Sequence, residues 1–225
     1  MTIKTLFDRI APVYDRLNDW FSLGQHHIWK MMTVKWSHAA SGDTCLDLCC
    51  GSGDITRSLA WQVGETGQVY GVDFSWELLQ VARKKSLGYP NISWVEADVL
   101  HLPFADNFCD AVTMGYGLRN VADISGSLQE IHRVLKPNAT AAILDFHRPD
   151  SGYMRQFQKL YLQTIVVPIA TQMGLGEEYA YLAPSIERFP NGKEQINIAL
   201  QLGFANAVHY PIANGIMGVL VVKKR

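Results

Sequence analysis

The residues most suited to chemistry gather in the segment 45–54, CLDLCCGSGD, where two adjacent cysteines meet a glycine pair. Cys49 and Cys50 can hardly form a strain-free disulfide, because that bond needs a wider separation of Cα atoms than one peptide unit allows. The four cysteines, at positions 45, 49, 50 and 109, also lack the paired spacing of a zinc site. We therefore expect reduced, buried side chains in a reducing compartment, and no metal.

The glycine loop that follows the cysteines is typical of nucleotide-type cofactor sites, since it joins an apolar run to a helical pattern. A dinucleotide fingerprint requires a third glycine three residues after Gly53, and that position holds Thr56. Asp54 stands at the expected helix start, where a carboxylate would repel a pyrophosphate. The loop favours an adenosine cofactor with positive charge and no phosphate, which describes S-adenosylmethionine.

Two more carboxylates follow the next apolar strands. Asp73 lies 22 residues past Gly51, where a carboxylate accepts the ribose hydroxyls of either cofactor class. Asp98 is placed to accept from an adenine amino group, with the Val99 amide beside it. Each carboxylate has a structural alternative, because Asp54 could cap a helix and Asp98 a turn. Three carboxylates at successive strand ends, together with the loop, favour the cofactor site.

These side chains have to be positioned by alternating strands and helices. The patterns predict helices over 55–63, 75–87, 123–135 and 193–202, and strands over 44–50, 68–73, 91–98, 109–117, 139–146, 206–212 and 216–222. The short turn at 213–215 makes the last two strands a hairpin. We expect an α/β fold, Rossmann-like, with a mostly parallel seven-stranded sheet, an antiparallel last strand and helices on both faces.

One domain over 1–225 is the simplest layout. A helical cap would occupy 1–40, with Thr2 and Thr5 as helix caps and Leu6, Ile10 and Leu17 at helical spacing. The cofactor core would span 41–149, and a helix and the hairpin would close the chain over 192–225. The alternation stops over 150–191, which is helical, apolar and aromatic, and we interpret it as a lid.

Composition and charge narrow the partners. The formal net charge of −1 gives no general attraction for nucleic acid, which we exclude as a partner. No apolar run reaches the ~18 residues that a membrane span needs, and the chain opens without a signal-peptide pattern. We expect a cytoplasmic protein that at most lies against a membrane surface, and the oligomeric state stays open.

Longer motifs carry a family resemblance over nearly the whole chain. The motifs are Tyr14-Asp15-x-x-Asn18 with Ser22-x-Gly24 and Trp29, then Gly115-Tyr116-Gly117-Leu118-Arg119-Asn120-Val121, Arg133-Val134-Leu135-Lys136-Pro137 and Tyr181-Leu182-x-x-Ser185-Ile186. With these motifs the chain resembles the class I methyltransferases, and among them the family that C-methylates demethylmenaquinol, demethylphylloquinol and ubiquinone precursors. The stretches 176–182 and 215–221 most resemble the phylloquinone branch of oxygenic phototrophs.

The sequence departs from the family pattern at three places. Asn138-Ala139 replace two glycines, and the triplet Asp145-Phe146-His147 replaces Glu-Phe-Ser. Gly115 stands where the family commonly has a serine, which puts one side-chain contact to the cofactor in doubt.

The resemblance implies C-methylation of a lipid-tailed naphthoquinol, with the lid as an apolar channel that opens toward a membrane such as the thylakoid. Arg119 would stabilise a developing phenolate, Asn120 would hold water or substrate, and Tyr14 would fold over the cofactor. His147 departs from the family pattern, and a histidine at a strand end is suited to act as a base. The structural alternatives are an Arg119–Asp123 ion pair and ordinary packing of the other side chains. The expected cofactor contacts are Asp47, Gly51, Gly53, Asp54, Thr56, Asp73, Phe74, Asp98, Val99 and Gly115.

Other function classes remain as alternatives. The acceptor could be a menaquinone or ubiquinone precursor, or a small metabolite methylated on oxygen or nitrogen, although an apolar lid disfavours a polar acceptor. A nicotinamide dehydrogenase is disfavoured by Asp54, by Thr56 and by the lack of a Tyr-x-x-x-Lys pair. A non-catalytic module would bind the cofactor without turnover.

Overall fold

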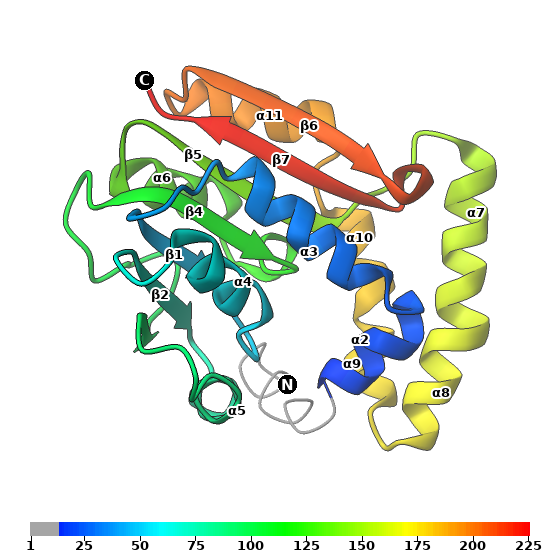
Figure 1. The fold of residues 1–225 in the computed structure, drawn as a ribbon. Coiled ribbons are helices and arrows are strands. Elements are labelled where there is room, and N and C mark those ends of the chain that lie inside the picture. The colour runs from blue at the N-terminus through cyan, green and yellow to red at the C-terminus, as the bar shows by residue number, and fades with distance from the viewer. Residues whose placement is uncertain (1–13) are drawn as a thin grey trace.

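A computed structural model describes residues 14–225, and the helix caps expected at Thr2 and Thr5 lie outside this range (Figure 1). One sheet contains the strands in the order β3-β2-β1-β4-β5-β7-β6. Their bounds are β1 Thr44–Leu48, β2 Gln68–Asp73, β3 Ile92–Glu96, β4 Cys109–Gly115, β5 Leu135–Phe146, β6 Asn206–Ile212 and β7 Met217–Lys223. Only β7 runs antiparallel to its neighbours, β5 and β6, which confirms the predicted fold class.

The helices fall close to the predicted segments, and the local signals that place them are visible. The Ser75 hydroxyl accepts from the Leu78 amide and begins α5, and Asp123 accepts from the Gly126 amide and begins α6. The helices of the core are α2 Tyr14–Ser22, α3 Gln25–Trp36, α4 Asp54–Val63, α5 Trp76–Lys85, η1 Leu118–Asn120, α6 Ile124–Val134 and α11 Gly192–Gln201, and η3 Ala213–Gly215 forms the hairpin turn.

The largest difference from a predicted boundary is at the start of β5. Helix α6 ends at Val134, and β5 begins at once with Leu135, which pairs with Cys109. The register then shifts between β4 and β5. This irregularity accommodates Pro137, which has no N–H to donate, and Asn138, whose φ is 66°.

Apolar side chains of both sheet faces form the core. Helices α3 and α4 cover one face, where Val34, Ile55 and Leu59 pack against β1 and β2. Helices α6 and α11 cover the other face, where Leu128 and Ala199 join the main cluster. The central strands β1 and β4 are buried on both sides. Because β1 to β5 run parallel, their carboxyl ends meet at one edge of the sheet.

The segment predicted as a lid is helical and stands at one end of the sheet (Figure 1). It contains α7 Gly152–Tyr161, the π-helical η2 Leu162–Val166, α8 Val167–Gln172, α9 Gly176–Ala180 and α10 Leu182–Arg188. Leu17 and Phe21 of α2 pack into it, and the Tyr161 hydroxyl donates to the Phe21 carbonyl at 2.8 Å. Within residues 14–225, every helix falls short of the length and apolar character that a membrane-spanning helix requires.

Candidate active site

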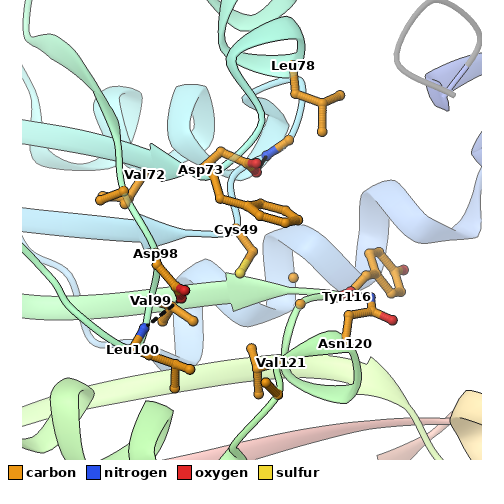
Figure 2. A pocket seen from close by; sticks show the side chains of 16 residues that line it. Cys49, Val72, Asp73, Leu78, Asp98, Val99, Leu100, Tyr116, Asn120 and Val121 are labelled. Atoms are coloured by element: carbon orange, nitrogen blue, oxygen red, sulfur yellow. Dashed lines mark hydrogen bonds between the residues drawn. The ribbon is translucent and has the colours of Figure 1, made fainter. Parts of the chain in front are cut away.

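The first cavity lies at the switch in strand order between β1 and β4, where ligands of open α/β sheets bind. It measures about 210 Å³. Figure 2 shows Asp73 and Asp98 on one side of it and Tyr116 and Asn120 on the other. Its lining comes from the loops after four strands: Cys49 and Gly51, then Val72, Asp73, Phe74 and Leu78, then Ala97, Asp98, Val99 and Leu100, and finally Gly115, Tyr116, Gly117, Asn120, Val121 and Ala122.

The glycine loop bends tightly into this cavity. Cys49 and Gly51 adopt left-handed conformations with φ of 52° and 55°. Gly53 has a φ of 82°, and a Cβ there would lie 2.6 Å from the Trp94 ring, so only glycine fits. Burial raises the pKa of both the Cys49 and Cys50 thiols, which makes them poor nucleophiles. The cysteines pack and shape the loop, as expected.

Asp73 braces the loop and faces the cavity. Its carboxylate accepts from the Gly51 amide at 2.8 Å and from the Ser75 amide at 2.9 Å, and the residue is 3% exposed. A carboxylate offers about four lone-pair sites, so it can accept further hydrogen bonds from a ligand. Asp98 is exposed and accepts from the Leu100 amide at 3.0 Å, in the turn that the sequence allowed as an alternative.

The first cavity fits an adenosine-type cofactor. Phe74, Leu78, Val99 and Leu100 offer apolar walls for a flat base, and the Asp73 carboxylate lies where a ribose would present its hydroxyls. A Cβ at Gly117 would lie 2.6 Å from the Cys49 side chain, so only glycine lets the backbone of this turn approach Cys49 so closely. Of the predicted cofactor contacts, Gly51, Asp73, Phe74, Asp98, Val99 and Gly115 line this cavity.

The four other predicted contacts, Asp47, Gly53, Asp54 and Thr56, lie outside the first cavity. Asp54 pairs with Lys30 at 2.6 Å and with Arg57. Burial raises the pKa of the Asp54 carboxyl, but the two cations outweigh burial and hold it below its ordinary value. Because Lys30 and Arg57 already balance the charge of Asp54, this carboxylate would not repel a pyrophosphate in the way that the sequence suggested. Lys30 was not singled out in the sequence.

Asp47 and Thr56 form a buried brace under the loop. Asp47 accepts from the Thr56 hydroxyl at 2.6 Å and from the Thr113 hydroxyl at 2.8 Å. Burial raises the pKa of the Asp47 carboxyl to about 7, although both hydroxyls favour the charged form. This network ties β1, β4 and α4 together. Asp47 and Asp54 line a small cavity beside the loop, whereas Gly53 and Thr56 line neither this cavity nor the first one.

A second, larger cavity of about 390 Å³ opens next to the first, between α2, α3 and the helical segment 152–188. Its lining is mostly aromatic and aliphatic: Phe21, Leu23, Trp29, Phe146, Phe157, Tyr161, Leu162, Val166, Tyr179, Tyr181, Leu182, Ala213, Ile216 and Met217. The polar exceptions are Ser22, Gln25, His26, Tyr116, Arg119, Asn120 and Gln158. The cavity suits a large apolar ligand with one polar end.

Tyr116 and Asn120 line both cavities, so the two spaces meet there. Tyr116 has a φ of 62°, a conformation that non-glycine residues adopt mainly where the surroundings enforce it, often at functional sites. Its carbonyl accepts from the Asn120 amide at 3.0 Å and from the Arg119 guanidinium at 2.6 Å. The turn after β4 thus positions the groups that divide the two cavities.

Arg119 faces the second cavity and pairs with Asp145, whereas the sequence suggested Asp123 as the alternative partner. The Asp145 carboxylate accepts from the Arg119 side chain at 2.9 Å and from its amide at 3.0 Å. Burial raises the pKa of the Asp145 carboxyl, and Arg119 opposes this shift. Among the described residues, the buried Arg119 Nε has no hydrogen-bond partner, and it remains available as a donor.

His147 is placed unfavourably for the expected role of a base. The centroid of its buried ring lies 4.6 Å from that of His209, and His147 lines neither of the two cavities. Burial lowers the pKa of His147. Tyr14 begins α2, but its side chain lies outside the described part of the structure.

Comparison with known proteins settles the family. The model described as the ubiE/COQ5 methyltransferase family matches residues 1–224. The chain belongs to that family. It is a methyltransferase with S-adenosylmethionine as its methyl donor, and the first cavity fits this cofactor.

Curated relatives of this protein come from cyanobacteria and from a plant. A 2-phytyl-1,4-naphtoquinone methyltransferase of Trichormus variabilis is 65% identical, with 99% of this chain and 98% of the relative covered. The chloroplastic 2-phytyl-1,4-beta-naphthoquinone methyltransferase of Arabidopsis thaliana is 50% identical over 98% of this chain and 87% of its own length. Both alignments cover the helical segment 152–188 as well as the core.

Solved structures share the fold at low identity. A methyltransferase from Aquifex aeolicus superposes with a TM-score of 0.66 at 20% identity, and covers 94% of this chain and 98% of its own. The CurJ carbon methyltransferase gives a TM-score of 0.61 at 15% identity, with 83% of this chain and 49% of that chain covered. At such identities the likeness supports the fold.

Tyr116, Ser22 and His26 line the cavities, and none of them was given a role from the sequence, although Ser22 belongs to the N-terminal signature. Two signals could have pointed to Tyr116 and His26. Tyr116 lies between two glycines directly after a predicted strand, and His26 lies one helical turn before Trp29 within the N-terminal signature.

Proposed function

We propose that this protein transfers a methyl group to a ring carbon of a prenylated naphthoquinol, with demethylphylloquinol as its substrate. The observation that carries the proposal is the pair of cavities that meet at Tyr116 and Asn120, one suited to adenosine and one apolar with a single polar end. The names of the relatives give the ring and the phytyl tail. Phylloquinol is the expected product.

The chemistry requires an activated ring carbon. A neutral aromatic carbon is a poor nucleophile, so a ring hydroxyl has to lose its proton before the neighbouring carbon can attack. Bound S-adenosylmethionine supplies an electrophilic methyl group on a positive sulfur. Arg119 stabilises the developing phenolate oxygen, held in place by Asp145, and Asn120 fixes the ring or a water at the junction. The alignment of two reactants supplies as much as ~7–11 kcal/mol.

The helical segment 152–188 acts as a lid and tail channel in this proposal. The ring would lie near Arg119 and Phe146, and the tail would run along Leu162 and Val166. It would leave the cavity past Leu23 and Phe157, which line the cavity and are still 85% and 47% exposed. The quinone form has no hydroxyl proton to lose, so the quinol is the reactive form.

A labelling experiment tests the function. The protein is incubated with methyl-labelled S-adenosylmethionine and 2-phytyl-1,4-naphthoquinone, with and without dithionite. We expect label on the ring carbon only with the reductant. No transfer with dithionite would refute the reaction, and equal transfer without it would refute the quinol requirement. A parallel assay with a menaquinone-type tail and a ubiquinone precursor tests the choice of substrate.

We also propose that the mouth of the second cavity lies against the membrane that holds the lipid substrate, such as the thylakoid. Tyr153, Phe157 and Leu160 recur at helical spacing on α7 and are 77%, 47% and 58% exposed. Phe157 belongs to the cavity mouth, so the apolar face of α7 continues from it.

Exchange of Tyr153 and Leu160 for Ser should reduce membrane binding by about tenfold, because each side chain would bury apolar surface at the interface. Flotation with anionic lipid vesicles measures the bound fraction. Trp61→Ser is the matched control, because Trp61 is 79% exposed on α4, at the other side of the molecule (Figure 1). Equal loss in the control, or no loss in the α7 variant, would contradict this placement.

A further inference from the structure

Three polar side chains form a chain from the second cavity to the surface. The His26 Nδ1 lies 2.7 Å from the Ser22 hydroxyl oxygen, and its Nε2 lies 3.6 Å from an Asp19 carboxylate oxygen. Ser22 and His26 line the cavity, whereas the Asp19 side chain is 49% exposed. His26 itself is 2% exposed, so its ring is enclosed between the substrate space and a solvated carboxylate.

The hydrogen bonds indicate how the protons are arranged. The Ser22 oxygen accepts from the His26 amide at 3.3 Å. The Nε2 side of the ring faces the Asp19 carboxylate, which favours the proton of the neutral ring on Nε2 and leaves Nδ1 as the acceptor toward the Ser22 oxygen. At 3.6 Å the carboxylate forms no hydrogen bond with the ring, and it acts through its charge, which favours the imidazolium form.

The proposed methylation releases one proton per turnover, and the cavity is largely apolar. The Arg119 guanidinium can stabilise a negative oxygen, but it is already protonated and cannot accept a proton. Its positive charge also disfavours a second cation in the cavity. Asn120 donates its amide to the Tyr116 carbonyl and is no base at neutral pH. Other side chains that line the second cavity therefore have to carry the proton away.

We propose that Ser22, His26 and Asp19 form a relay that carries the hydroxyl proton of the substrate out of the cavity. This inference rests on the proposed function. The substrate O–H bond breaks and its electron pair stays on the oxygen as a phenolate. The proton moves to the Ser22 oxygen, while the Ser22 proton moves to the His26 Nδ1. The imidazolium then gives its Nε2 proton to Asp19 or to water, which leaves the neutral ring protonated on Nδ1, and proton exchange with water restores the Nε2 form before the next turnover. The activated ring carbon forms its bond to the methyl group as the methyl–sulfur bond breaks, and the hydrogen on that carbon moves as a proton to the ring oxygen, so that one proton leaves per turnover.

The charges around His26 keep it neutral between transfers. Burial lowers its pKa to about 4, helped by Lys30 and His27, while Asp19 and Asp54 oppose the shift. Because the folded-state pKa lies below neutrality, the ring holds a proton only briefly and passes it on. Below that pKa the ring is protonated and cannot accept, so the relay would stop in acid.

Variants of the relay test this inference in the full-length protein. His26→Gln keeps a similar volume and a hydrogen-bonding group but cannot carry a proton, and we expect kcat to fall by about 10²-fold with little change in KM. Its residual rate should rise with pH, because hydroxide then takes the proton. Ser22→Ala should lower kcat about tenfold, whereas Ser22→Thr keeps the hydroxyl and should retain the wild-type kcat. His27→Gln is the matched control, since His27 is exposed and also contacts Asp19, at 3.0 Å.

Two readouts other than activity complete the test. Cofactor affinity by calorimetry should be unchanged in His26→Gln, and nitrogen-15 NMR of the histidines at neutral pH should place the His26 proton on Nε2. A proton on Nδ1, a kcat within twofold of wild type, or an equal loss in His27→Gln would overturn the relay. If wild type itself fails to methylate the naphthoquinol, the proposed function falls and the relay falls with it.

Discussion

Arg119→Gln is expected to lower kcat by about 10²–10³-fold, the usual cost of removing one donor from a developing oxyanion. The affinity for S-adenosylmethionine should change little, because Arg119 lines the second cavity and not the first. Steady-state kinetics with the reduced naphthoquinol and calorimetry with the cofactor measure the two effects.

The pairing of Arg119 with the buried Asp145 complicates this variant, and the structure supplies the control. Loss of one partner of a buried ion pair costs about 3–5 kcal/mol of folding stability, because the other charge stays buried and unpaired. Arg119→Gln alone should therefore lower the melting temperature, and the double variant Arg119→Gln/Asp145→Asn should recover most of it. The double variant should stay as slow as the single one. If it regains activity along with stability, Arg119 is structural.

Asp73→Ala should weaken the binding of S-adenosylmethionine by about 10²-fold. Hydrogen bonds to a charged group contribute ~1.5–3 kcal/mol, and tenfold in affinity corresponds to about 1.4 kcal/mol. The variant also removes the acceptor for the Gly51 amide, so part of the loss comes from the loop. Calorimetry with the cofactor and with S-adenosylhomocysteine measures the change, and both ligands should lose affinity alike.

Two matched variants separate the contributions of Asp73. Asp73→Asn keeps an acceptor for the loop amide but loses the negative charge, and we expect an intermediate affinity. Among the described residues, the exposed Asp98 carboxylate bonds only within its own turn, so Asp98→Ala should weaken cofactor binding by about tenfold. An unchanged affinity in Asp73→Ala would exclude the ribose role, and a larger loss in Asp98→Ala would reverse the assignment of the two carboxylates.

Local patterns determined the core of the fold. The runs at 68–73 and 206–212 became β2 and β6 with the predicted bounds, and Ser75 and Asp123, at the predicted starts of two helices, cap α5 and α6. These features depend on short-range physics, namely backbone sterics and hydrogen bonds within a few residues. The α6–β5 junction differed, because pairing of Leu135 with Cys109 across the sheet outweighed the local signal of Pro137.

The sequence also determined the family, through motifs along most of the chain, and with the family the methyl donor. It placed the glycine loop, Asp73 and Asp98 at one edge of the sheet, since each of them lies within a single βα unit. Only the tertiary structure decided the partners of each charge. Asp54 is balanced by Lys30 from another helix, Arg119 by Asp145 rather than Asp123, and the His147 ring packs against His209 outside both cavities. Ion pairs and cavities join residues far apart in the chain, and their spacing in the sequence leaves no periodic trace.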